Sequence, residues 1–139
     1  MINTNYPDSP ALIIKDHVDS YSGLFGKILA FSKLFTGKGY GKIAIFSENR
    51  PEWLYAFFAG WQNGAMVVPV DFLSSADDAA YILNDCRPEL VFYSQGVSQT
   101  WNKVAGKLQY VPETIVFEDI ILGIDMTAVP WKLIYNPAR

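Results

Sequence analysis

The sequence has few of the residues from which metal centres, disulfides and catalytic triads are built. Its 139 residues include one cysteine, Cys86, and one histidine, His17. A single cysteine excludes an internal disulfide and a multi-cysteine metal site. A catalytic cysteine would need His17 as its base. Asp16 and Asp19 flank His17, but neighbours in a tight turn rarely converge. We therefore expect His17 to be a surface turn residue and Cys86 to be a packing residue.

Strong charge of one sign and long apolar runs are also missing. The net charge is −3, with acidic and basic residues interspersed, which gives no electrostatic footprint for nucleic acid. The nearly apolar run at residues 65–70 is far too short to span a bilayer. The start of the chain has neither a basic cluster nor an apolar stretch, so it predicts no signal peptide. These features favour a cytoplasmic protein.

Apolar and aromatic residues are plentiful, at 50% and 15% of the chain. A chain of this length corresponds to about one domain of the usual size. Residues 1–10 are polar and contain prolines, which predicts a loosely held tail. The stretch "DHVD" predicts a turn that leads into a second short strand. Hydrophobic periodicity predicts strands at 11–15, 42–46, 65–70, 89–93, 114–117 and 131–135, and helices at about 21–35, 50–62, 75–86 and 99–108.

This alternation of strands and helices predicts an α/β fold. Repeated βα units form a doubly wound, mostly parallel sheet with helices on both faces. Ser20 is the expected N-cap of the first helix, and Ser75 or Ser74 that of the third. Asn49 and Glu52 fit a capping box for the second helix. Pro69 lacks a backbone N–H, so it marks a strand end or an edge strand.

The glycine-rich segment "GKGYGK", residues 37–42, superficially resembles a phosphate-binding loop. Such a loop follows a strand and opens a helix, so that backbone N–H groups face the phosphate. This segment follows a helix and precedes a strand, which indicates a helix end and a turn. Asp77 and Asp78 fall in the first turn of the third helix, where carboxylates complement the helix dipole.

Polar residues follow the predicted strands at the edge where doubly wound sheets bind ligands. They form no recognisable catalytic set, and solvated strand ends would account for them. They could also contribute polar groups to a pocket. These residues are Ser47, Glu48, Asn49, Asp71, Ser94, Gln95, Glu118 and Asp119.

Residues 10–95 resemble the N-terminal segment of the AMP-forming acyl-CoA synthetases, in the adenylate-forming superfamily. The motifs that carry the resemblance are "SYSGL", "GKGYGKIAIFSENRPEW", "WQNGAMVVPVDF" and "ADDAAYILNDCRPELVFYS". They keep the family's spacing, and "ENRPEW" is most similar to the long-chain fatty-acid members. The chain departs from the family's pattern at Gly23, in place of an acidic residue, and at Tyr40, where a charged residue is frequent.

The resemblance implies an ATP-dependent long-chain fatty-acid–CoA ligase that forms an acyl-adenylate and then acyl-CoA, with ATP, magnesium and coenzyme A as its cofactors and co-substrates. In this family a loop of the form "TSGTTGxPK" holds the phosphates, and a mobile C-terminal domain supplies a lysine. Neither occurs in the sequence, so no catalytic, cofactor or metal residue is assigned. We expect one α/β unit over residues 1–139, in which residues 96–139 end before the phosphate loop. We expect the chain to be inactive alone and to have the rest of the enzyme as its partner. The alternative is a stand-alone flavodoxin-like binding or interaction domain.

The helix "WLYAFFAGW" is apolar on nearly all sides, which predicts a helix buried on several sides. Trp53, Phe57, Phe58 and Trp61 are therefore expected to be core residues, with an acyl tunnel as the alternative. A subdomain separated from its neighbour would expose an apolar face. We expect a homodimer, with residues 131–135 as the most favoured contact. The parent enzyme could also bind peripherally to a membrane, since long-chain acids partition into lipid.

Overall fold

The computed structural model describes residues 8–14 and 17–120. The expected strand at 131–135 and most of the expected tail at 1–10 lie outside these ranges. The elements are, in chain order, β1 (Pro10–Ile14), β2 (His17–Ser20), α1 (Tyr21–Lys33), β3 (Lys42–Phe46), α2 (Pro51–Gln62), β4 (Met66–Val70), α3 (Ala76–Cys86), β5 (Leu90–Tyr93), α4 (Ser98–Ala105) and β6 (Glu113–Val116), with 3-10 helices η1 (Gln95–Val97) and η2 (Phe117–Asp119).

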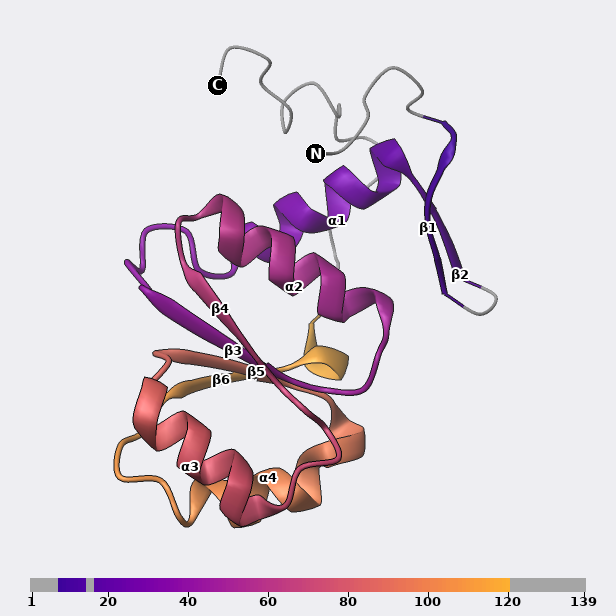
Figure 1. Cartoon of the computed structure of the whole chain (residues 1–139). Helices are drawn as coiled ribbons and strands as arrows, with labels where there is room; N and C mark the ends of the chain where they lie inside the picture. The colour runs from indigo at the N-terminus through magenta and orange to yellow at the C-terminus, as the bar shows by residue number, and fades with distance from the viewer. Residues whose placement is uncertain (1–7, 15–16, 121–139) are drawn as a thin grey trace.

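The main sheet has four parallel strands in the order β4-β3-β5-β6. Helices α1 and α2 cover one face and α3 and α4 the other (Figure 1). The predicted α/β class and doubly wound parallel sheet are confirmed. The chain adds β4 on one side of β3 and then adds β5 and β6 on its other side, so the strand order reverses between β3 and β5 while all strands stay parallel. Strands β1 and β2 form a separate antiparallel pair beside α1 (Figure 1).

The central strands are buried on both faces, as expected for a covered parallel sheet. In β3, Ile43 and Ile45 point into the core beneath α1 and α2, while Ala44 and Phe46 point toward α3 and α4. Strand β4 is an edge strand. The Met66 N–H donates to the Gly41 carbonyl, so the backbone groups of residues 66, 68 and 70 face β3. Pro69 therefore turns its missing donor outward, and of the two expected positions, a strand end or an edge strand, the edge strand is confirmed.

Most helix ends follow the expected capping. The hydroxyls of Ser20 and Ser75 accept hydrogen bonds from the backbone N–H groups of Gly23 and Asp78, both at 3.1 Å. The capping box at Asn49 is wrong: the N-cap of α2 is Arg50, with no side-chain cap bond. Pro51 at the first helical position forces the preceding residue into extended backbone, which moves the start of the helix one residue along.

The expectation that all four large aromatic residues of α2 are core residues is partly wrong. Trp53, Phe57 and Phe58 are partly buried against the core, but Trp61 is 68% exposed. The fully buried stripe consists of Tyr55 and the small residues Ala56, Ala59 and Gly60. A Cβ at Gly60 would lie 3.0 Å from a methyl group of Val67. The helix thus presents its small residues to the sheet, and the large ones flank the contact.

Candidate functional site

The carboxyl ends of β3, β5 and β6 lie at the same end of the sheet. The strand order reverses there, between β3 and β5. Glu48 follows β3, Ser94 follows β5, and Glu118 lies in η2 directly after β6. In doubly wound folds this crevice is the usual place for a ligand. It is therefore the candidate site that the fold itself indicates.

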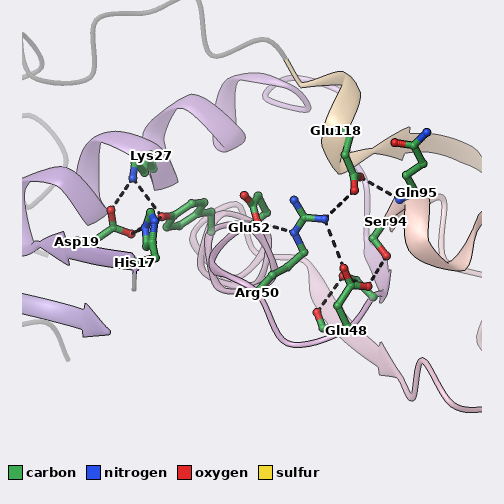
Figure 2. Close-up of polar contacts among 11 residues, drawn as sticks. His17, Asp19, Lys27, Glu48, Arg50, Glu52, Ser94, Gln95 and Glu118 are labelled. Atoms are coloured by element: carbon green, nitrogen blue, oxygen red, sulfur yellow. Dashed lines mark hydrogen bonds and ion pairs between the residues drawn. The ribbon is translucent and has the colours of Figure 1, made fainter. Parts of the chain in front are cut away.

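The side chains here are joined by Arg50, from the loop between β3 and α2 (Figure 2). Its Nε lies 2.6 Å from a carboxylate oxygen of Glu52, and its Nη1 lies 2.8 Å from Glu118 and 3.5 Å from Glu48. Ser94 Oγ donates to Glu48 at 2.6 Å. The backbone N–H of Gln95 donates to Glu118 at 2.9 Å. We call Glu48, Arg50, Glu52, Ser94, Gln95 and Glu118 the Arg50 network.

Burial and hydrogen bonding set the charge of this network. Burial pushes the pKa of Glu48 upward, but the hydrogen bond from Ser94, a backbone hydrogen bond and the charge of Arg50 outweigh it, so the pKa lies below its usual range. The pKa of Glu118 is also lowered. Burial raises it, but the hydrogen bonds from the Gln95 N–H and the Arg50 guanidinium lower it by more. Both carboxylates are therefore ionised at neutral pH, whereas a general acid or base needs a pKa near the working pH.

The Arg50 network holds neither a nucleophile nor a metal site. Ser94 is fully buried and its hydroxyl is committed to Glu48, so the hydroxyl does not face solvent. Among the described residues, no group of three or more histidine, cysteine, aspartate or glutamate side chains could hold a metal ion. What the arrangement does is tie the loop after β3 to the segments after β5 and β6.

Four of the six residues of this network are among the strand-end residues that the sequence indicates. The sequence places Glu48, Ser94, Gln95 and Glu118 at one edge, either as solvated strand ends or as polar groups of a pocket. The two carboxylates are partly solvated, but Arg50 pairs with both Glu48 and Glu118, which the sequence does not predict. Arg50 itself was missed, since its role depends on Glu118, 68 positions further along the chain. Ser47, also a strand-end residue, is buried, and its hydroxyl contacts both the carbonyl and the carboxylate of Glu48. In the described part of the chain, the others form no ion pair or hydrogen bond with Arg50: Asp71 accepts from the Leu73 N–H, Asn49 is not the cap of α2, and Asp119 lies in η2.

The expectation for His17 is also wrong. His17 lies in strand β2 rather than in a turn, and strand geometry places residues two apart on the same face. Its Nε2 therefore lies 3.0 Å from Oδ2 of Asp19 and 3.1 Å from the hydroxyl of Tyr55. The Asp19 carboxylate also accepts from Lys27 and from Tyr55. We call His17, Asp19, Lys27 and Tyr55 the Asp19 network (Figure 2).

The remaining candidates have local structural roles. Cys86, a half-buried free thiol, is the last residue of α3. Asp77 and Asp78 lie in the first turn of α3, as expected, and Asp77 pairs with Lys107 at 2.8 Å. Gly37 and Gly39 have positive φ angles of 80° and 72° in the connection between α1 and β3. Helix α1 already ends at Lys33 with Leu34 as its C-cap, so the expected helix cap in the glycine segment is wrong and the expected turn before β3 is confirmed.

None of the helices among the described residues is long and apolar enough to cross a membrane.

The fold and the geometry define a class: a doubly wound α/β unit that carries the Arg50 network at the point where its strand order reverses. A family model described as AMP-binding enzyme matches residues 2–129, and the chain belongs to this family. The predicted resemblance to AMP-forming acyl-CoA synthetases is confirmed at this level.

The matched relatives are CoA ligases. The chain is similar to 4-hydroxybutyrate–CoA ligase 2 of Metallosphaera sedula, with 27% identity over 117 residues, 82% of this chain and 21% of that protein. It is 30% identical over 82 residues to crotonobetaine/carnitine–CoA ligase of Proteus mirabilis, covering 57% of this chain and 16% of that protein. The chain thus spans about a fifth or less of the curated relatives it matches.

Solved structures share the fold. The anthranilate CoA ligase AuaEII, in complex with anthranoyl-AMP, superposes with a TM-score of 0.75 at 20% identity. The superposition covers 83% of this chain and 23% of that chain. At this level of identity the similarity establishes the arrangement of helices and strands.

Proposed function

We propose that this chain is the N-terminal part of an ATP-dependent, AMP-forming acyl-CoA ligase and serves as scaffold for the adenylate-binding portion. The observation that carries the proposal is the family match over residues 2–129. In the proposed whole protein, a carboxylic acid and ATP give an acyl-adenylate and pyrophosphate, and coenzyme A then displaces AMP. ATP, magnesium and coenzyme A are bound elsewhere in that protein, because this chain lacks the phosphate loop and the catalytic lysine of the family.

The scaffold role is supported by the hydrogen bonds of the Arg50 network. Its carboxylates are already engaged by Arg50, Ser94 and the Gln95 N–H. We propose that residues 1–139 behave as one α/β unit, that the isolated chain is catalytically inactive, and that the rest of the enzyme is its main partner. A cytoplasmic location with peripheral membrane contact, and a homodimer of the isolated chain, belong to the same proposal.

For the acid substrate we propose a long-chain fatty acid, on the strength of "ENRPEW", residues 48–53. The relatives' names specify 4-hydroxybutyrate and crotonobetaine or carnitine, which are small polar acids. A panel of palmitate, 4-hydroxybutyrate and crotonobetaine therefore separates the two substrate classes. The panel is run with the protein translated from the coding sequence extended past Arg139.

The test of the proposal is pyrophosphate release with ATP and magnesium, run in parallel on the 139-residue chain and on the extended protein. The expected result is turnover by the extended protein and none by the short chain above a mock purification from the same host. Turnover by the short chain would overturn the scaffold role. A stop codon directly after Arg139, with no turnover, would favour the alternative of a stand-alone flavodoxin-like binding domain.

A further inference from the structure

The β1–β2 pair is structurally separate from the main sheet. It forms its own two-stranded antiparallel sheet, with Leu12 opposite Asp19, Ile13 opposite Val18 and Ile14 opposite His17. An isolated two-stranded hairpin is at best marginally stable in water. Its persistence therefore depends on contacts with α1 and α2.

Apolar packing supplies only part of these contacts. Ile13 and Val18 form a cross-strand pair on the outer face, and they are 65% and 55% exposed. On the inner face Leu12 packs against the core beneath α1 and α2. The residues that face inward beside it in β2 are polar, His17 and Asp19. The polar half of the inner face must therefore be held by hydrogen bonds and charge.

Asp19 is the point where this polar half meets the rest of the fold. It is 4% exposed and is the only charged side chain in the buried class among the described residues. Its Oδ1 lies 2.5 Å from Nζ of Lys27 in α1. Its Oδ2 accepts from the hydroxyl of Tyr55 in α2 and contacts His17 of its own strand. One carboxylate thus joins β2 to both helices.

The groups that face Asp19 would lose their partner if its charge were removed. Lys27 on α1, His17 on β2 and Tyr55 on α2 contact it, and Glu52 on α2 acts on Tyr55 from a greater distance. A buried donor left without its acceptor carries the full cost of its desolvation. Burial pushes the pKa of Asp19 upward, but the hydrogen bonds from Lys27, Tyr55 and His17 outweigh it, and its pKa lies below the usual value of 3.8.

We propose that the ionised Asp19 carboxylate is a latch for the β1–β2 pair: it holds the two strands on α1 and α2, and its neutralisation releases them together while the four-stranded sheet stays folded. The two regions share no strand pairing, so the β1–β2 pair can open without breaking a hydrogen bond of the main sheet. Local opening of such units below the global unfolding free energy is common in folded proteins.

The test is amide hydrogen exchange on the 139-residue chain at neutral pH, read separately for β1–β2 and for β3 and β5. Asp19→Asn removes the charge and keeps the shape. Asp77→Asn is the matched control, because Asp77 pairs with Lys107 on the surface. Asp19→Asn should accelerate exchange in β1–β2 at least about tenfold, with less than about threefold change in β3 and β5, as expected for local opening. Asp77→Asn should change neither region.

Equal acceleration in both regions, or no change in β1–β2, would overturn the latch. If Asp19→Asn does not fold, Lys27→Gln removes the partner of the carboxylate in α1 and keeps the carboxylate itself. Exchange in β1–β2 should again accelerate more than exchange in β3 and β5. The wild-type chain gives an independent result on acidification. Because the pKa of Asp19 is lowered, its contribution is complete above the usual value of 3.8 and is lost as pH falls through the lower folded value. Protection in β1–β2 should then fall before protection in the sheet, and simultaneous loss would count against the latch.

Discussion

The Asp19 network and the Arg50 network are built from the same kinds of group but differ in burial. In each, one charged side chain is surrounded by partners from three segments of the chain (Figure 2). The central side chain is 3% exposed for Asp19 and 23% exposed for Arg50, and the carboxylates around Arg50 are 29–39% exposed.

This difference decides how much each network contributes to stability. Removing one partner of a buried pair leaves an uncompensated charge, whereas exposed pairs contribute about 0–1 kcal/mol. Water can solvate the carboxylates of the Arg50 network if their partner is lost, but it reaches Asp19 poorly. The number of ion pairs in a network is therefore a poor guide to its contribution to stability.

Three packed aromatic rings connect the two networks, and we call Phe31, Tyr55 and Phe117 the aromatic floor. Phe31 of α1 packs edge-on against Tyr55, with ring centroids 5.5 Å apart, and lies 6.2 Å from Phe117. The guanidinium of Arg50 lies over the ring of Phe117, 5.6 Å from its centroid. The Phe31 ring is fully buried. A change at Phe31 should thus loosen both networks together.

Phe31→Ala should cause the largest loss of stability. Both networks should loosen together, so the difference in their contributions to stability should disappear. Truncation of a buried phenylalanine costs about 3–5 kcal/mol, because it combines lost transfer energy with a cavity. Urea denaturation followed by tryptophan fluorescence measures the loss. A reduction of less than about 1 kcal/mol would show that the floor is not a shared support.

Tyr55→Phe should cost about 2 kcal/mol, since a hydrogen bond to a charged group contributes about 1.5–3 kcal/mol. The ring stays in place, so its packing against Phe31 is kept, and only the hydroxyl that donates to Asp19 is lost. The same urea experiment gives the value. If the loss is smaller than that of Arg50→Met, the comparison of the two networks is wrong.

Arg50→Met should cost about 1 kcal/mol, because its carboxylate partners can turn to solvent. The lowered pKa values of Glu48 and Glu118 give the pH dependence. Groups with lowered folded pKa values stabilise above their usual pKa, here 4.5, and lose that contribution as pH falls through the folded value. The difference between wild type and Arg50→Met should therefore be complete at neutral pH and vanish in acid. A difference that grows in acid would contradict the assignment.

Asp77→Asn should cause the smallest loss of stability, because its ion pair is the most exposed of those compared. Asp77 and Lys107 have side chains that are 80% and 49% exposed. Exposed pairs are screened by salt, so the melting temperature should not change measurably at moderate salt. A clear drop in the thermal melt would show that exposure alone does not rank these contacts.

Local rules predicted the elements well where neighbouring residues determine them. The alternation of β3 and the caps at Ser20 and Ser75 follow from residues within a few positions of one another. The start of α2 was misplaced, although the signal was local: Pro51 outweighs the capping preference of Asn49. The motifs in residues 10–95 predicted the family, because their spacing is itself a property of the sequence.

Periodicity and spacing are enough to predict the class of fold and the family, and the missing N–H of Pro69 limits β4 to a strand end or an edge. Which polar groups meet depends on the folded arrangement of the chain. Arg50 finds Glu118 across 68 positions, and Asp19 finds Tyr55 across 36. The tertiary structure also decided which side of α2 is buried, because Ala56, Ala59 and Gly60 allow close approach to the sheet while Trp61 remains in solvent. Such choices depend on which surfaces fit together in space, and that information is spread over the whole chain.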